Sequence, residues 1–105
     1  MPTYIACYDL KETNPDPYPT FMTQAIAHDW EYWIEGSRNA SYRLPNTTLR
    51  GVFADMAAAV AALENVRSWT EFDMKCTVTM SKWIIVEYSD ARFASDERHH
   101  VERRP

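Results

Sequence analysis

Thr-Tyr-Ile-Ala-Cys-Tyr-Asp-Leu-Lys, residues 3–11, is an apolar run that predicts a strand in the middle of a sheet. Its aromatic, β-branched and thiol side chains alternate between the two faces of the pleat, so we expect both faces to be buried. Asp9 stands where this strand meets water. A carboxylate at the end of a rigid strand suits either a chemical role or a loop cap, and the sequence leaves both interpretations open.

Length and composition predict one globular domain. The chain has 105 residues, enough for a single core, and 46% of them are hydrophobic. The formal net charge is −4, so no overall basic field draws in nucleic acid. Neither a Walker-type nor a dinucleotide-type glycine motif occurs, and this excludes the two commonest nucleotide-binding signatures.

The absence of targeting signals and the contexts of the two cysteines predict a cytoplasmic protein without a membrane partner. No apolar run approaches the roughly 20 residues that cross a bilayer, and no leader pattern opens the sequence. Cys7 and Cys76 stand in strand-like apolar contexts, away from any histidine at ligand spacing. We interpret them as reduced core thiols rather than as a disulfide or a metal site.

The sequence after the first strand predicts a helix and then aromatic strands. The proline-rich segment Glu12–Pro19 should be a stiff connection, because each proline restricts its own φ and the residue before it. Apolar side chains at helical spacing then predict a short helix that ends near His28. Strand patterns follow at Trp30–Ile34, at Ser41–Leu44 and, as a separate strand or a continuation, at Leu49–Phe53.

The second half of the chain predicts a long helix and a long strand. Asp55 is a good N-cap for a helix from Met56 to about Phe72, and the alanines of this helix suggest close packing on a sheet. Thr77–Tyr88 is rich in β-branched and aromatic residues, which predicts a strand. Its alternation shifts at Ser81, so a bend or a split is expected there.

The order strand, helix, strand, strand, helix, strand predicts an α+β fold of the ferredoxin-like βαββαβ type. In this fold one antiparallel sheet carries two helices on one face, and the first strand lies at the centre. Residues 1–90 are expected to form this single domain, followed by a charged, flexible tail at 91–105. An aromatic-rich second face of the sheet would favour a homodimer.

The opening strand resembles that of a superfamily of small ferredoxin-like proteins, which includes the CRISPR-associated Cas2 proteins, the VapD-type toxins and the SinR-like proteins. The likeness covers about the first third of the chain and is carried by Tyr4, Ile5, Tyr8, Asp9 and Leu10. It implies that Asp9 is the catalytic residue and metal ligand of a phosphodiester-cleaving homodimer. Two facing carboxylates can hold one Mg²⁺ ion, which polarises a phosphate and activates a water molecule.

Other features favour a binding role. The net charge is negative, and the arginines that nuclease-type relatives carry after the aspartate are absent. In the segment Leu44–Leu49, polar side chains between two arginines could contact a phosphate or another polar ligand, or could form a turn between strands. The candidate ligand-binding residues are Tyr8, Arg43, Asn46, Thr47, Thr48 and Arg50.

The sequence therefore supports two main hypotheses and leaves the choice between enzyme and binding module open. The first is a cytoplasmic homodimer that acts as a non-catalytic interaction or regulatory module, with an unidentified protein or RNA as partner. The alternative is a Mg²⁺-dependent endoribonuclease or toxin-like nuclease that uses Asp9 at the dimer interface. A third class is a haem- or cofactor-dependent oxygenase, for which His28 is the candidate axial ligand.

Overall fold

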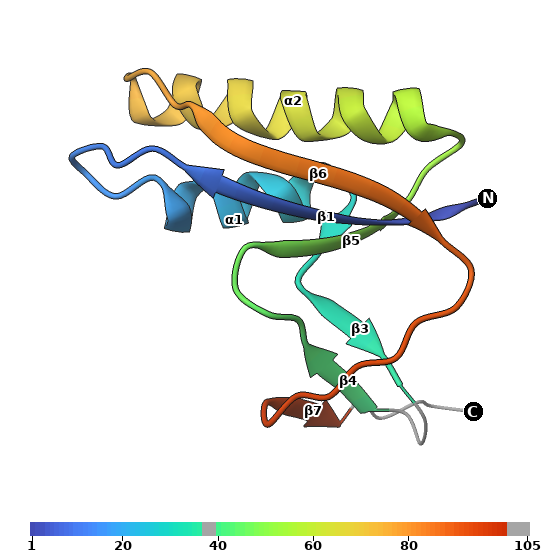
Figure 1. The fold of residues 1–105 in the computed structure, drawn as a ribbon. Coiled ribbons are helices and arrows are strands. Elements are labelled where there is room, and N and C mark those ends of the chain that lie inside the picture. Colours follow the sequence, from blue (N-terminus) through green and yellow to red (C-terminus); the bar gives the residue numbers. More distant parts are fainter. Residues whose placement is uncertain (37–39, 101–105) are drawn as a thin grey trace.

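The computed structural model of the chain describes residues 1–36 and 40–100. Within them, helices and antiparallel sheets form an α+β fold (Figure 1). In chain order the elements are β1 (Thr3–Leu10), α1 (Tyr18–Ala27), β2 (Trp30–Glu31), β3 (Trp33–Glu35), β4 (Ala40–Arg43), β5 (Thr48–Val52), α2 (Met56–Met74), β6 (Met80–Tyr88) and β7 (Arg98–His100). None of the described helices is long and apolar enough to span a membrane.

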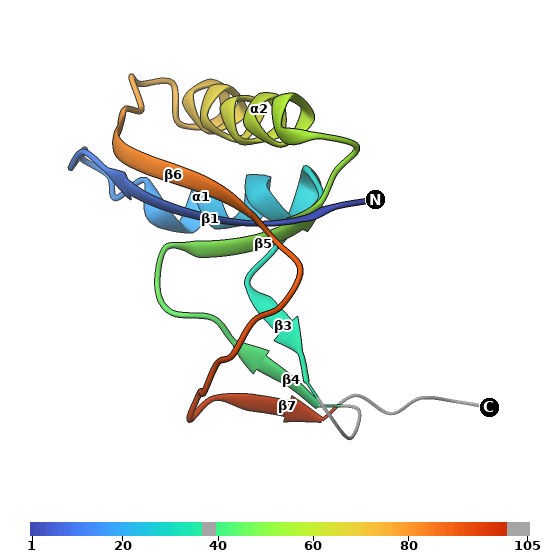
Figure 2. The same cartoon turned by 45° about the vertical axis from the view of Figure 1, so that its right-hand side comes forward.

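The ferredoxin-like βαββαβ prediction is wrong, because the strands form two separate sheets. A four-stranded sheet has the order β2-β5-β1-β6, and a three-stranded sheet has the order β3-β4-β7. Figure 2 shows the second sheet projecting from the first, with the chain after β6 descending to reach it. This number and order of strands does not fit one sheet built from four strands.

The second sheet arises from a bend at Tyr32, inside the segment predicted as one strand. β2 pairs with β5, whereas β3 pairs with β4. The carbonyl oxygen of Tyr32 accepts hydrogen bonds from the Leu44 N–H at 2.9 Å and from the Arg43 guanidinium at 3.1 Å. These bonds satisfy the carbonyl group outside either sheet ladder, so the chain can change sheets here.

β1 lies at the centre of the four-stranded sheet, between β5 and β6, as predicted. It is antiparallel to both neighbours. Its side chains alternate: Tyr4, Ala6 and Tyr8 are buried, whereas Cys7 and Asp9 are exposed. The prediction that both faces of this strand are buried is therefore wrong, since the core forms on one face only.

Both helices contribute to that core, and they lie side by side (Figure 1). Their buried apolar side chains join those of β1 in one cluster. The helical members that are at most 1% exposed are Phe21, Ala25, Ala59, Leu63 and Val66. Fully burying a large apolar side chain stabilises a fold by roughly 1.5–3 kcal/mol, so this cluster is the main source of stability.

The ends of α2 follow from local sequence. The Asp55 carboxylate accepts a hydrogen bond from the Ala58 N–H at 2.8 Å, so the predicted N-cap is confirmed. Lys75 ends the helix in the left-handed conformation, with φ of 55°, and its N–H donates to the Glu71 carbonyl at 2.8 Å. The helix is therefore capped at both ends.

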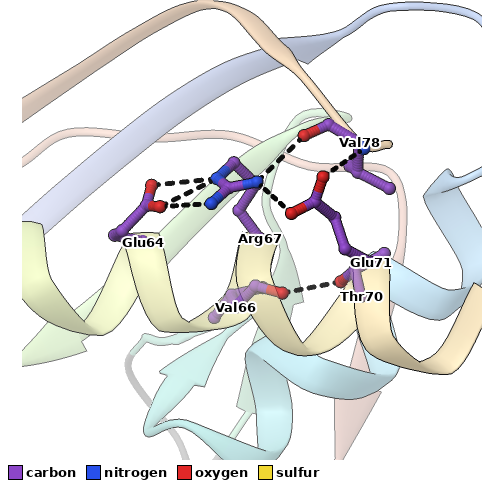
Figure 3. Close-up of polar contacts among 6 residues, drawn as sticks. All are labelled: Glu64, Val66, Arg67, Thr70, Glu71 and Val78. Carbon is purple, nitrogen blue, oxygen red and sulfur yellow. Dashed lines mark hydrogen bonds and ion pairs between the residues drawn. The ribbon is translucent and has the colours of Figure 1, made fainter. Parts of the chain in front are cut away.

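A polar network fastens α2 to the segment that precedes β6 (Figure 3). The Arg67 guanidinium donates to Glu64, to Glu71 at 2.6 Å and to the Val78 carbonyl oxygen at 3.3 Å. The other carboxylate oxygen of Glu71 accepts the Val78 N–H at 2.9 Å. Arg67, which the helical pattern places toward solvent, thus holds two segments of the fold together.

β6 is an outer strand of the four-stranded sheet and begins later than the sequence predicts. Asp9 lies opposite Lys82 but Leu10 lies opposite Met80, so the register shifts at Ser81, where the alternation of the sequence changes. Beyond β6, residues Arg98–His100 of the predicted tail form β7, which pairs with β4. The end of that tail, residues 101–105, lies outside the described residues.

Candidate functional site

The helix-free face of the four-stranded sheet carries Asp9, and we call it the open face. Residues directly opposite each other on paired strands share a face, so the register defines its members. The open face includes Ile5, Cys7 and Asp9 on β1, Arg50 and Val52 on β5, and Lys82, Ile84 and Val86 on β6. Asp9 is exposed at one end of this face, at the mouth of the central strand, as the sequence suggested.

Asp9 lines a cavity of about 310 Å³ at that end of the open face. Lys82, which lies opposite Asp9 on β6, and Thr47, from the turn before β5, line the same cavity. The Tyr8 N–H donates to the Thr47 carbonyl oxygen at 3.1 Å, and this bond holds the turn against β1. An acidic, a basic and a hydroxyl-bearing residue therefore border one small hollow.

One copy of the chain does not assemble a metal centre from its described residues. No three His, Cys, Asp or Glu side chains in residues 1–36 and 40–98 gather closely enough to hold an ion. Asp9 could hold a cation such as Mg²⁺ only together with water and a ligand from elsewhere. A second copy of the chain is one source of such a ligand, as the resemblance described above implies.

Tyr8 also borders this cavity, but its hydroxyl lies in the protein core. The hydroxyl is 2.8 Å from that of Tyr32, and the Tyr8 ring packs on Phe21 with centroids 4.5 Å apart. Burial raises the pKa of both tyrosines, so both hydroxyls stay protonated at neutral pH. Tyr8 thus joins β1 to the bend at Tyr32 through a bond that buries two polar groups together.

The structure separates the other predicted ligand-binding residues. Arg43 and Asn46 border a cavity of about 320 Å³ beside Asp96, while Thr47 borders the cavity of Asp9. Thr48 is 8% exposed. The positive φ of 60° at Thr47 turns the chain and sends consecutive side chains in different directions.

Arg50 lies apart from these residues, in the middle of β5. Its guanidinium is 3.7 Å from the Glu31 carboxylate, and its Nε donates to the Tyr88 hydroxyl at 3.1 Å. Arg43 and Arg50, which flank the loop in sequence, therefore lie in different surroundings. The arrangement does not bring the six predicted residues into a single anion site.

The remaining candidates also have defined places. Cys7 and Cys76 are free thiols, and Cys7 is exposed on the open face rather than in the core. The Nδ1 atom of His28 is 2.7 Å from the Gln24 carbonyl oxygen, and the imidazole packs against Trp69. His28 therefore has neighbours on both helices at the end of α1.

Sequence reasoning missed a further cavity, which is mostly apolar and lies between α1 and the aromatic segment that follows it. Its volume is about 300 Å³, and Trp30, Trp33 and Arg43 are among the residues that line it. The three tryptophan and tyrosine residues between positions 30 and 33 were a visible signal, but their alternation was interpreted only as a strand. The contact with Arg43 depends on the bend at Tyr32, which the pattern does not show.

A scan against protein-family models and searches among curated proteins and solved structures found no match to this chain.

Proposed function

We propose that this chain is a non-catalytic interaction module that associates with a second copy of itself through the open face. The observation that carries this proposal is the apolar surface exposed there. Ile84 is 58% exposed, Val86 44% and Val52 39%. Contiguous apolar surface of this kind marks interaction sites, because leaving it in water is unfavourable.

The strand register makes these side chains one patch rather than scattered residues. On the central strand, Ile5 lies opposite Val86, and Cys7 lies opposite Ile84. Cross-strand neighbours on one face are close enough for their side chains to touch. An apolar strip therefore runs along β1 and β6, and Asp9 stands at one end of it.

The charges around this strip suit an interface between identical copies. A twofold interface brings the same patch of each copy together. Asp9 and Lys82 lie opposite each other and have opposite signs, and Arg50 has Glu31 nearby. Self-association would therefore bring together surfaces that carry both signs, which lowers the electrostatic cost of burial.

Kinship with the Cas2, VapD and SinR-like superfamily and a cytoplasmic location are parts of this proposal, although the two-sheet fold departs from the single sheet of that superfamily. The first is supported by the Tyr4–Leu10 stretch. The second is supported by the free thiols Cys7 and Cys76, since unpaired cysteines are usual in a reducing compartment. If the module is regulatory, the dimer binds a further protein or an RNA.

Sedimentation analysis over a range of concentrations tests the proposed dimer. We expect the wild-type chain to dimerise and Ile84→Lys to remain monomeric, because the lysine places a charge in the apolar strip. Phe72→Lys is the matched control, since Phe72 is 70% exposed on α2, away from the open face. A monomeric wild type, or an Ile84→Lys variant that dimerises like the control, would overturn the proposal.

A second candidate function is Mg²⁺-dependent cleavage of RNA with Asp9 as metal ligand. The specific observation in its favour is that Asp9 is exposed, borders a cavity and lies on the same open face. Face-to-face association could then bring two Asp9 carboxylates to one ion. The ion would lower the pKa of a bound water and stabilise the charge that develops on the phosphate.

Cleavage of a labelled RNA with Mg²⁺, with EDTA and without added metal separates the two candidates. The nuclease hypothesis expects cleavage that EDTA abolishes and that Asp9→Ala removes while the dimer persists. Lys82→Ala, which changes the residue opposite Asp9, provides a comparison on the same surface. Absence of metal-dependent cleavage supports the non-catalytic module, whereas unchanged cleavage by Asp9→Ala would show that Asp9 is not the metal ligand.

A further inference from the structure

The cavity between α1 and the aromatic segment has the composition of a small-molecule site. Met22 and Ile26 line it from α1, and Trp30 and Trp33 line it from β2 and β3. Ligand sites are typically hollows with mostly apolar walls and a few polar groups, and about 300 Å³ is at the small end of their range. The walls suit a molecule with one or two rings.

Trp30 supplies a buried aromatic ring to the wall of this cavity. The residue is 1% exposed, and its indole N–H has no hydrogen-bond partner within residues 1–36 and 40–100. A buried tryptophan usually finds an acceptor for this group, because an unpaired donor has lost its water without compensation. The nitrogen itself has less than 1 Å² of exposed surface, so Trp30 gives the cavity an apolar wall and not a donor that a ligand can reach.

Arg43 supplies a positive charge to the wall of the cavity, and its contacts fix its position beside Tyr32. Its Nη1 donates to the carbonyl oxygens of Tyr32, at 3.1 Å, and Leu44, at 3.4 Å. Its guanidinium carbon lies 4.8 Å from the centroid of the Tyr32 ring. All hydrogen bonds that this side chain makes within the described part of the chain use Nη1, so Nε and Nη2 remain as donors.

Among the described residues that line this cavity, Glu31 is the acidic one. It is 63% exposed, and its carboxylate lies 3.7 Å from the guanidinium of Arg50. Solvent and Arg50 therefore offset its repulsion toward an anion. Arg43, with two unused donor nitrogens, dominates the polar character of the site.

We propose that this cavity binds a small aromatic carboxylate. The ring lies between the apolar side chains of α1 and the tryptophans, and the carboxylate accepts hydrogen bonds from Arg43. This site is separate from the open face, so the outcome of its test does not depend on the proposed dimer.

Two probes of the same shape test the proposal on the full chain: 1-naphthoate and the neutral 1-naphthalenemethanol. We expect 1-naphthoate to bind at least about tenfold more tightly, because only the carboxylate uses a charge-assisted bond to Arg43. Calorimetry gives the two affinities. Equal affinities, or no binding of either probe, would overturn the assignment of a carboxylate site.

Variants of exposed residues then locate the binding. Ile26 is 64% exposed, so Ile26→Trp should fill the cavity without disturbing the core, and it should reduce 1-naphthoate affinity by about tenfold or more. Glu31→Gln should increase the affinity, since it removes a negative charge from the wall. Phe72→Ala, a change on α2 that is remote from the cavity, should leave the affinity unchanged.

A spectroscopic readout tests the role of Trp30. The indole N–H resonance of Trp30, assigned with Trp30→Phe, should shift when 1-naphthoate binds, because the aromatic ring of the ligand then lies against the wall that Trp30 forms. Arg43→Lys keeps the charge but loses the planar donor pair, and weaker binding with the same resonance shift is expected. Tight binding by Ile26→Trp, or a Trp30 resonance that does not move, would contradict the proposed site.

Discussion

Replacing Glu71 by Gln tests whether the polar network holds α2 to the segment that precedes β6. Each carboxylate oxygen of Glu71 has its own donor: one accepts from Arg67 at 2.6 Å and the other from the Val78 N–H at 2.9 Å. A glutamine side chain has the same shape but only one acceptor oxygen. Its amide N–H₂ must therefore face one of the two donors, and that donor loses its partner.

The expected cost follows from the lost bond and its surroundings. A hydrogen bond to a charged group contributes roughly 1.5–3 kcal/mol, and an unpaired buried donor costs a similar amount. The Glu71 side chain is 30% exposed, so water compensates part of this cost. We expect Glu71→Gln to lower the free energy of unfolding by about 2 kcal/mol, and Tm by roughly 8–16 °C.

Urea unfolding followed by circular dichroism measures this difference, with Glu64→Gln as the matched control. Glu64 pairs with the same guanidinium, but it is 54% exposed and, within the described residues, makes no bond to the segment that precedes β6, so its replacement should cost only about 0.5 kcal/mol. Equal losses in the two variants would show that the bond to Val78 is not important. A Glu71→Gln variant as stable as the wild type would refute the reasoning altogether.

The pH dependence provides an independent check. The hydrogen bond from the Val78 N–H, and then that from Arg67, hold the pKa of Glu71 below its ordinary value of 4.5. A lowered pKa in the folded state means that the stabilisation is complete above about pH 4.5 and is lost as the pH falls through the folded value. The difference between wild type and Glu71→Gln should therefore shrink below pH 4.5. A constant difference down to pH 3 would contradict the assignment.

Two further substitutions test backbone conformation and packing. Lys75→Gly should stabilise the protein by about 0.5–1 kcal/mol in thermal unfolding, because φ is 55° there and glycine adopts this conformation without steric cost; a lower Tm would contradict this. Gly51→Ala should destabilise it by about 1–3 kcal/mol, since the new methyl group would lie 2.4 Å from Phe53 and 2.9 Å from Trp30; an unchanged urea midpoint would show that these rings move aside freely.

Much of the local structure could be predicted from the sequence. The two helices are defined by the spacing of their apolar residues and by local signals such as Asp55, which act within a few residues. The central place of the first strand and the irregularity at Ser81 followed from composition and alternation. The exposed position of Asp9 followed from the point at which the apolar run ends.

The candidate sites were harder to predict, because each combines segments that are distant in sequence. The hollow beside Asp9 needs Lys82 from the outer strand, and the apolar cavity needs Arg43 next to Trp30. The polar loop from Arg43 to Arg50 looked like one site, yet its side chains leave in different directions. Adjacency in sequence was a poor guide there, because alternation in strands and the turn at Thr47 separate neighbours.

By itself, the sequence determined the helices, the main strands and the acidic end of the central strand. These depend on backbone preferences and on periodicity, which operate over short distances along the chain. Only the tertiary structure decided that the strands divide into two sheets and that one face of the larger sheet stays open. The division depends on hydrogen bonds from Arg43 and Leu44 to the Tyr32 carbonyl oxygen. Such long-range bonds form only when the whole chain is folded, and residue patterns carry no record of them.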